Sequence, residues 1–266
     1  MQLEMLISSV NAVPAELTTK MNIQCDAVLV NQCDMDADES FTQQNRTVRV
    51  FSRNERGVGK SRNLALKHAQ GDILLFSDED IVYKDGYVSL ILEEFEKHPE
   101  AELLLFNVEV CPERKTYWNE GFFRVKWYNC GRYPAYSIAV RKEALDRSKV
   151  KYSELFGGGA KYSNGEDSLF LKECADSGIK MYATDVVIGR EEARESTWFH
   201  GYTEKFFFDR GVLFTFLYGG FAWVWALRFV CTKKEILQGE IKRKQAYRLI
   251  KAGIKQGKAE KNLLKG

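Results

Sequence analysis

Three adjacent acidic residues, Asp78, Glu79 and Asp80, follow the apolar run Ile73–Phe76. A short apolar run of this kind predicts a buried strand, so the acids would project from its carboxyl end. Close carboxylates repel one another unless a cation lies among them, and Mg²⁺ and Mn²⁺ take oxygen ligands that they often share with substrate phosphates. The pattern therefore indicates a metal–diphosphate site; the alternative is a solvated acidic turn.

A basic loop that contains two glycines lies just upstream of these acids. Its cations are Arg53, Arg56, Lys60 and Arg62. Gly57 and Gly59 would let the backbone approach a ligand closely, and the cations would meet phosphate oxygens. The alternative is an ordinary charged loop that opens a helix. A P-loop is excluded, because the G-x-x-x-x-G-K-[ST] spacing needs a glycine where Asn54 stands.

A second acidic pair, Glu166 and Asp167, opens a predicted helix after Gly165. Acids at a helix N-terminus are stabilised by the helix dipole, and this explanation suffices for Glu166. Asp167 has a second interpretation as a general base that removes the proton of an attacking hydroxyl. The upstream run Gly157–Gly159 could then frame an acceptor pocket.

Two further groups of residues carry open alternatives. His200 lies among aromatic residues, where it is either structural or approaches the metal from the far side of the pocket. Asp34, Asp36 and Asp38 follow the second predicted strand, and a carboxylate there could bond a base or a ribose. Their spacing is not a calcium loop, because the glycine that such a loop needs at its sixth position is missing.

Apolar runs alternate with amphipathic stretches along the first hundred residues, which predicts an α/β fold with a mostly parallel sheet covered on both faces. Predicted strands are Met5–Val10, Ala27–Val30, Thr47–Phe51, Ile73–Phe76, Leu103–Val110, Tyr136–Val140 and Met181–Ala183. Predicted helices are Pro14–Ile23, Gly59–Ala69, Gly86–His98 and Glu166–Ser177. Ligands of such sheets bind at the carboxyl ends of the strands, so the loops 31–38, 52–60 and 77–85 should gather at one edge.

Composition limits the function classes. A net charge of +2 over 266 residues argues against a nucleic-acid partner. The six cysteines form no C-x-x-C pair, which favours free thiols in a reducing compartment. The N-terminus lacks the basic and apolar regions of a signal peptide, so we expect a cytoplasmic protein.

The C-terminal region is apolar and then basic. Gly211–Leu227 carries no charge over seventeen residues, but Gly219 and Gly220 interrupt it, and a spanning helix needs roughly 20 residues. The segment from Lys233 onward is rich in Lys and Arg. Phe206–Val230 is therefore either an interfacial anchor beside an anionic membrane or a helical hairpin that packs on the domain and completes the acceptor pocket.

Together these motifs resemble the family-2 glycosyltransferases of the GT-A fold. The matching residues are Gly57-Val58-Gly59, Arg62-Asn63, Ala69-Gln70-Gly71-Asp72, Ile73–Phe76, Asp78-Glu79-Asp80 and Gly165-Glu166-Asp167. The likeness covers residues 1–190. It implies a catalytic domain over 1–200, with a nucleotide-sugar half (1–110) and an acceptor half (111–200), and a helical extension over 201–266.

The resemblance implies a role for each site residue. Asp167 would be the base of an inverting displacement, and Asp80, with Asp78, would bind Mn²⁺ or Mg²⁺. His200 stays a further candidate ligand from its own position in the sequence. Asp78 would also contact the nucleotide sugar. The other donor-binding residues would be Val10, Asn11, Asp34, Arg53, Gly57, Lys60, Arg62, Asn63, Glu79 and Glu166.

The expected activity is hexose transfer from a nucleotide-diphosphate sugar, UDP favoured, to a saccharide or lipid-linked saccharide in bacterial surface polysaccharide or glycolipid synthesis. Glu79 stands where the family often has Ser, which leaves open which acid holds the metal. The alternatives are a nucleotidyltransferase, whose glycine-rich basic loop is absent after the first strand, and a non-catalytic carbohydrate-binding module.

Overall fold

The computed structural model describes residues 1–192, 201–233, 236 and 241–264, which form two compact units. The first unit holds Met1–Glu154 and the chain from Glu166 through the last strand. The second holds Leu155–Gly165 and the C-terminal helices. Leu155–Gly165 thus groups with the helices that follow it much later in the chain, whereas the domain boundary at residue 200 stays a prediction.

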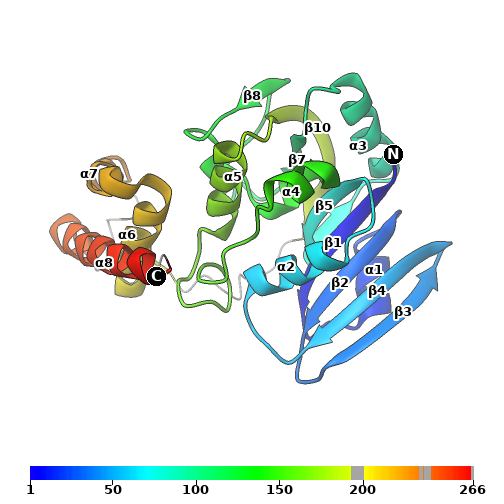
Figure 1. Cartoon of the computed structure of the whole chain (residues 1–266), viewed down its shortest axis with the longest axis horizontal. Helices are drawn as coiled ribbons and strands as arrows, with labels where there is room; N and C mark the ends of the chain where they lie inside the picture. The colour runs from blue at the N-terminus through cyan, green and yellow to red at the C-terminus, as the bar shows by residue number, and fades with distance from the viewer. Residues whose placement is uncertain (193–200, 234–235, 237–240, 265–266) are drawn as a thin grey trace. The chain divides into compact units, whose positions relative to one another are not determined.

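The first unit is built on one mixed sheet, ordered β3-β4-β2-β1-β5-β9-β7-β10-β6 in the described chain, with β8 beside β10 (Figure 1). The strands are β1 (Leu3–Val10), β2 (Asp26–Gln32), β3 (Ala37–Gln43), β4 (Arg46–Arg53), β5 (Ile73–Asp78), β6 (Ile81–Tyr83), β7 (Leu103–Glu109), β8 (Phe123–Val125), β9 (Ile138–Arg141) and β10 (Met181–Glu191). The neighbours β4, β2, β1 and β5 are all parallel. β9 is antiparallel to both β5 and β7, and β3 is antiparallel to β4, so the sheet is parallel from β4 to β5 and mixed on either side.

Helices cover both faces of this sheet. They are α1 (Pro14–Lys20), α2 (Val58–His68), α3 (Tyr87–Lys97), α4 (Lys142–Ser148) and α5 (Glu166–Asp176), with short 3₁₀ turns at Cys130–Arg132 and Ala135–Ser137. Successive strand residues point to opposite faces, so each strand supplies both cores. On β5, Leu74 and Phe76 pack in the core beneath α2, α4 and α5, whereas Ile73 and Leu75 pack beneath α1 and α3. The same alternation puts Asp78 on the face that α2 and α5 cover.

The predicted edge for ligand binding is present. Asp78 is in register with Ser8 on β1, Val10 with Gln32 on β2, and Gln32 with Arg53 on β4. The carboxyl ends of β4, β2, β1 and β5 therefore meet at one edge of the sheet, which confirms the expected α/β fold.

Several elements were not predicted, among them the short strands β6 and β8, the edge strand β3 and the helix α4. β3 forms an antiparallel hairpin with β4 through Gln44 and Asn45, which both have positive φ. Its sequence is mostly polar and its side chains are largely exposed, so it lacks the apolar alternation that predicts a strand. α4 is short and carries only two buried residues, Ala144 and Leu145, which give no clear helical period.

Within its described residues, the second unit contains α6 (Glu204–Tyr218), α7 (Ala222–Thr232) and α8 (Arg243–Leu263), with a 3₁₀ turn at Gly219–Phe221. α6 and α8 approach closely, because a Cβ on Gly211 would lie 2.0 Å from the Ile250 carbonyl oxygen. The loop 155–165 is fixed to these helices by the Tyr162 hydroxyl, which donates to Glu260 at 2.9 Å, and by Ser163, which donates to Asp209.

One stretch of this unit, Glu204–Thr232, is long and apolar enough by composition to cross a membrane, with a mean hydropathy of 1.4. It is not one straight helix. The backbone breaks at Gly219, where φ is 55°, and α7 folds back to pack on α6 and α8. The stretch therefore forms a helical hairpin with one face of α7 exposed, whereas its packing on the catalytic domain and its part in an acceptor pocket stay predictions.

Candidate active site

The side chain of Arg62 lies at the centre of an acidic cluster on the first unit. Its guanidinium donates to Asp78 Oδ1 at 2.9 Å, to Asp167 Oδ1 at 2.6 Å and to Glu166 Oε1 at 3.3 Å. Only 4% of the side chain is exposed. A planar guanidinium presents several donors in fixed directions, so one Arg can hold carboxylates from β5 and α5 at the same time.

The start of α2 determines where Arg62 points. Gly57, with φ of 131°, adopts a conformation that other residues rarely take, and the side-chain amide of Gln32 holds it by accepting from its N–H and donating to its carbonyl. A Cβ on Gly59 would lie 2.2 Å from the Ser153 carbonyl oxygen, so only glycine permits this close approach. One turn later, Arg62 faces the core side, with its guanidinium 5.0 Å from the Tyr152 ring centroid.

Asp167 is held at both carboxylate oxygens. Oδ1 accepts from Arg62, and Oδ2 accepts from the backbone N–H of Ala135 at 3.0 Å. Burial raises the pKa of Asp167 to about 7, and the negative charges of Glu166 and Asp78 act in the same direction. Arg62 and the Ala135 amide oppose this shift, but one guanidinium faces three carboxylates. Asp167 is thus a positioned carboxyl group that changes protonation near neutral pH, as a general base requires.

The three acids at the end of β5 have different environments. Asp78 is partly exposed and pairs with Arg62, whereas Asp80 is buried. Glu79 accepts from the backbone N–H of Val10 at 3.0 Å, which ties the end of β5 to the end of β1. Glu79 therefore braces the two strands, a role that its place in the acidic run did not suggest.

Asp78 and Asp80 are the candidate carboxylates for a divalent cation at the end of β5. Within the described residues, no group of three or more His, Cys, Asp or Glu side chains gathers to hold a metal. Asp78 and Asp80 still suit Mg²⁺ or Mn²⁺, because such ions commonly bind through one or two carboxylates and fill their other positions with substrate phosphates and water. His200, predicted as a further ligand, lies outside the described residues.

The residues near β2 and β4 that were predicted to contact the nucleotide differ in their hydrogen bonds and ion pairs. The Asp34 carboxylate is 94% exposed and 3.6 Å from Arg56. Asp36 instead accepts from the backbone N–H of Asn54, and Arg53 donates to Asp38 on β3 and to nearby carbonyls. Asp34 and Asp36 are both exposed, and Asp36 in addition accepts the backbone hydrogen bond from Asn54. Arg53 braces the β3–β4 hairpin.

Val10 and Asn11 end β1 at the same edge. The backbone N–H of Asn11 donates to the Gln32 carbonyl at 3.1 Å, and its φ is 50°. The side chain of Asn31 holds the next residue, Ala12, by accepting from its N–H and donating to its carbonyl, both at 3.0 Å. The loop after β1 is thus fixed by the end of β2.

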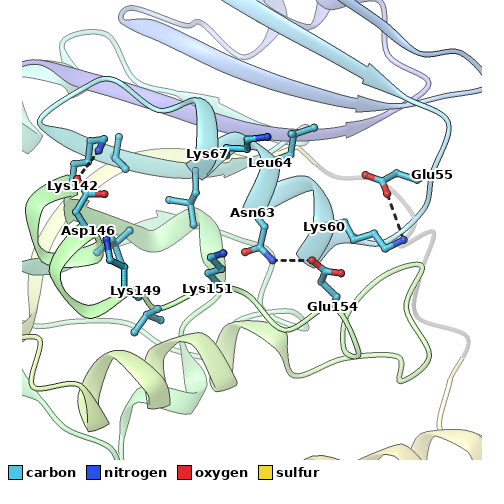
Figure 2. A pocket seen from close by; sticks show the side chains of 14 residues that line it. Glu55, Lys60, Asn63, Leu64, Lys67, Lys142, Asp146, Lys149, Lys151 and Glu154 are labelled. Carbon is cyan, nitrogen blue, oxygen red and sulfur yellow. Dashed lines mark hydrogen bonds and ion pairs between the residues drawn. The ribbon is translucent and has the colours of Figure 1, made fainter. Parts of the chain in front are cut away.

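Lys60 and Asn63 lie on another side of α2 from Arg62. With side chains from α4 and the segment after it, they line a pocket of about 640 Å³ (Figure 2). Asn63 donates to the Tyr152 carbonyl at 2.9 Å and accepts from its N–H at 2.8 Å. Neither Arg62, Asp78 nor Asp167 lines this pocket. The structure therefore brings Arg62, Asp78, Glu166 and Asp167 together and places Lys60 and Asn63 apart from them.

Comparison with known proteins identifies the family. The family model "Glycosyl transferase family 2" matches residues 10–148, which is more than half of the chain. The chain belongs to glycosyl transferase family 2. The match contains Arg62 and Asp78–Asp80 but ends before Glu166, so the place of Asp167 in this family-2 site rests on its bond to Arg62.

Solved structures share the fold of this family-2 chain at low identity. S. aureus TarS 1-349 in complex with UDP-GlcNAc is 15% identical, with a TM-score of 0.58 over 94% of this chain and 70% of that one. The mannosyltransferase PcManGT from Pyrobaculum calidifontis in complex with GDP-Man and Mn²⁺ is 14% identical, with a TM-score of 0.52 over 97% of this chain and 75% of that one. These likenesses support the GT-A fold. A search of curated protein sequences found no match.

Three residues near the site were not predicted from the sequence, and each of them holds another residue in place. Gln32, Asn31 and Tyr152 hold the loops around the site or pack against Arg62. The sequence does contain a signal for Asn31 and Gln32. They are adjacent amide residues at the end of an apolar strand, and buried amides need hydrogen-bond partners. Tyr152 gave no such signal.

Proposed function

We propose that this chain transfers a hexose from a nucleotide-diphosphate sugar to an acceptor hydroxyl with inversion at the anomeric carbon. The observation that carries the proposal is the Arg62 cluster, in which Asp167 of α5 is fixed beside Asp78 of β5. A base and a donor-binding acid held by one buried cation form a compact centre for such a displacement.

In this mechanism the acceptor hydroxyl attacks the anomeric carbon from the face opposite the nucleotide. Asp167 accepts the hydroxyl proton as the new bond forms, and Arg62 with the Ala135 amide keeps its carboxylate in place. The leaving diphosphate departs with the bonding electrons. Asp78 and Asp80 would hold Mn²⁺ or Mg²⁺, which when bound would neutralise charge on that diphosphate.

UDP is the nucleotide that we favour. S. aureus TarS 1-349 is described in complex with UDP-GlcNAc and with UDP, whereas PcManGT is described with GDP-Man, so the related folds hold more than one nucleotide. The exposed carboxylate of Asp34 beside β2 is available for a ribose or base contact. Val10 and Asn11 lie at the same strand edge.

We place the reaction in bacterial surface polysaccharide or glycolipid synthesis, at the cytoplasmic side. The described cysteines are all free, which supports a reducing compartment. The acceptor would be a saccharide or a lipid-linked saccharide.

Ligand-induced stabilisation tests the proposal against its rivals. UDP with Mn²⁺ is expected to raise the melting temperature, because a ligand that binds only the folded state stabilises it, whereas UDP with EDTA should have a much smaller effect. Stabilisation by UTP and a sugar phosphate, with formation of a nucleotide sugar, would indicate a nucleotidyltransferase. Stabilisation by saccharides alone would indicate a binding module.

The raised pKa of Asp167 predicts opposite pH dependences for activity and stability. The rate constant kcat/KM should rise with pH through about 7, since the base must be ionised in the free enzyme. In contrast, the folded state holds the proton up to that pKa while the unfolded state releases it near pH 4. The free energy of unfolding should therefore fall between about pH 4 and pH 7, by up to roughly 4 kcal/mol for a shift of this size.

Urea unfolding at several pH values and a pH–rate profile check these two slopes. The matched control is Asp167→Asn, which should flatten the stability slope because no proton binds there. A profile of kcat/KM that is flat from pH 5.5 to 8.5 would contradict a base with this pKa.

A further inference from the structure

One face of α7, together with Phe221 just before the helix, exposes large apolar side chains. The exposed fractions of Phe221, Trp223, Val224 and Leu227 are 72%, 58%, 41% and 49%. The opposite face of the helix is buried: Ala222, Ala226 and Val230 pack in the core between α6, α7 and α8. The exposed residues therefore form a second apolar face of α7 that the unit itself does not cover.

The sequence of α7 is almost free of charge. The helix contains no acidic residue, and its single cation is Arg228, whose guanidinium lies 5.1 Å from the Trp225 ring centroid. A helix that is apolar all round is normally buried or in contact with lipid, and a contiguous exposed apolar patch marks an interaction site. Scattered surface hydrophobics would need no such explanation.

The neighbouring helix α8, which packs on α7, has a strongly basic exposed side. Its exposed cations are Arg243, Lys244, Arg248, Lys251, Lys255 and Lys258. The one acidic residue of α8, Glu260, is buried and accepts hydrogen bonds from Lys161, Tyr162 and Gln256. The outward charge of α8 is thus positive without acidic compensation.

We propose that α7 and α8 form a docking surface for a membrane that contains anionic lipid. Trp and Phe side chains insert favourably at the boundary of headgroups and acyl chains, and Lys and Arg attract anionic headgroups. The break at Gly219 makes α7 a separate short helix, too short to span a bilayer but suited to lie in its surface. The cations favour anionic lipid over a second copy of this chain, whose own α8 is equally positive.

This proposal rests on the proposed function in one respect: membrane docking would bring the enzyme to a lipid-linked acceptor. The surface would bind lipid whether or not the chain transfers sugar. Membrane binding and UDP binding are therefore measured side by side on the same full-length protein, so that failure of one is distinguishable from failure of the other.

The experiment is flotation with vesicles of phosphatidylcholine alone and of phosphatidylcholine with 30% phosphatidylglycerol. The wild type should float with the anionic vesicles and lose binding as salt rises. Replacing Lys251, Lys255 and Lys258 with Gln should weaken that binding on the order of 100-fold, because each cation near an anionic surface contributes about five-fold. Trp223→Ser with Leu227→Ser should weaken it at every salt concentration.

The matched controls lie on the first unit. Replacing the exposed Lys67, Lys149 and Lys151 with Gln removes the same charge and should leave flotation unchanged, as should Trp118→Ser. Wild-type protein that binds UDP but floats with neither vesicle overturns the membrane proposal alone. A dimer in light scattering that Trp223→Ser converts to a monomer, without vesicle binding, would assign the patch to a second copy instead.

Discussion

Replacing Arg62 with methionine is expected to abolish sugar transfer and to destabilise the first unit by about 3–5 kcal/mol. Methionine keeps much of the apolar stem but removes the cation that faces Asp78, Glu166 and Asp167. Three carboxylates would then share a partly buried site without an opposing charge. Urea unfolding at pH 8 measures the loss of stability, and nucleotide release from the donor measures activity.

The control for this change is Arg56→Met. Arg56 comes from the same basic loop, but its side chain is 40% exposed and its pair with Asp34 spans 3.6 Å, so the stability change should stay below about 1 kcal/mol. Arg62→Lys separates the effect of charge from that of geometry. An ammonium restores the positive charge, but it lacks the planar set of donors with which the guanidinium binds carboxylates on both β5 and α5. Its stability should recover more than its activity. Full activity in Arg62→Met would remove Arg62 from the centre of the site.

Asp167→Asn is expected to lower kcat by a factor of about 10²–10⁴ while donor binding changes little. The amide is nearly the same size as the carboxylate, and it can keep one of the two hydrogen bonds to Arg62 and Ala135. It cannot accept the acceptor proton. Comparing kcat with the UDP dissociation constant separates loss of chemistry from loss of binding.

Glu166→Gln is the neighbouring control. Glu166 opens the same helix and contacts the same guanidinium at the longer distance of 3.3 Å, whereas the Ala135 amide donates to Asp167. Its kcat should fall far less than that of Asp167→Asn. Near-wild-type turnover in Asp167→Asn, or an equal loss in Glu166→Gln, would show that the base is assigned to the wrong residue.

The central strands and the chemistry-bearing edge were predictable because buried parallel strands are continuous apolar runs. Ile73–Phe76 and Ala27–Val30 are short, apolar and bounded by polar residues, and both are central strands in the structure. β3 was not predictable in this way, because pairing with β4, and not burial, holds it in place. The local pattern of apolar residues therefore predicts buried strands well, but it predicts strands at the edge of a sheet poorly.

The site was predictable as a set of residue types but not as a set of contacts. Arg62 and Asn63 are adjacent in the matching motif, yet successive helical residues point about 100° apart. Arg62 reaches the acids, and Asn63 holds the backbone of Tyr152. Similarly, Glu79 lies between two acids in the sequence but turns to the backbone of Val10. Which side of an element faces the ligand depends on long-range packing.

The C-terminal region shows the same limit. The sequence left an interfacial anchor and a packed hairpin as alternatives for Phe206–Val230. Apolar composition alone cannot separate them, since both need it. In the structure, α7 packs on α6 and α8 within the second unit, and its other side exposes Trp223 and Leu227.

The most direct test of the proposed transferase is nucleotide release from UDP-, GDP- and dTDP-sugars by the purified chain, with Mn²⁺, Mg²⁺ or EDTA. The account predicts release from one donor that requires metal, increases with acceptor and is lost in Asp167→Asn. No release from any donor, together with no metal-dependent UDP binding, would contradict the assignment of Arg62, Asp78 and Asp167 to a sugar-transfer site.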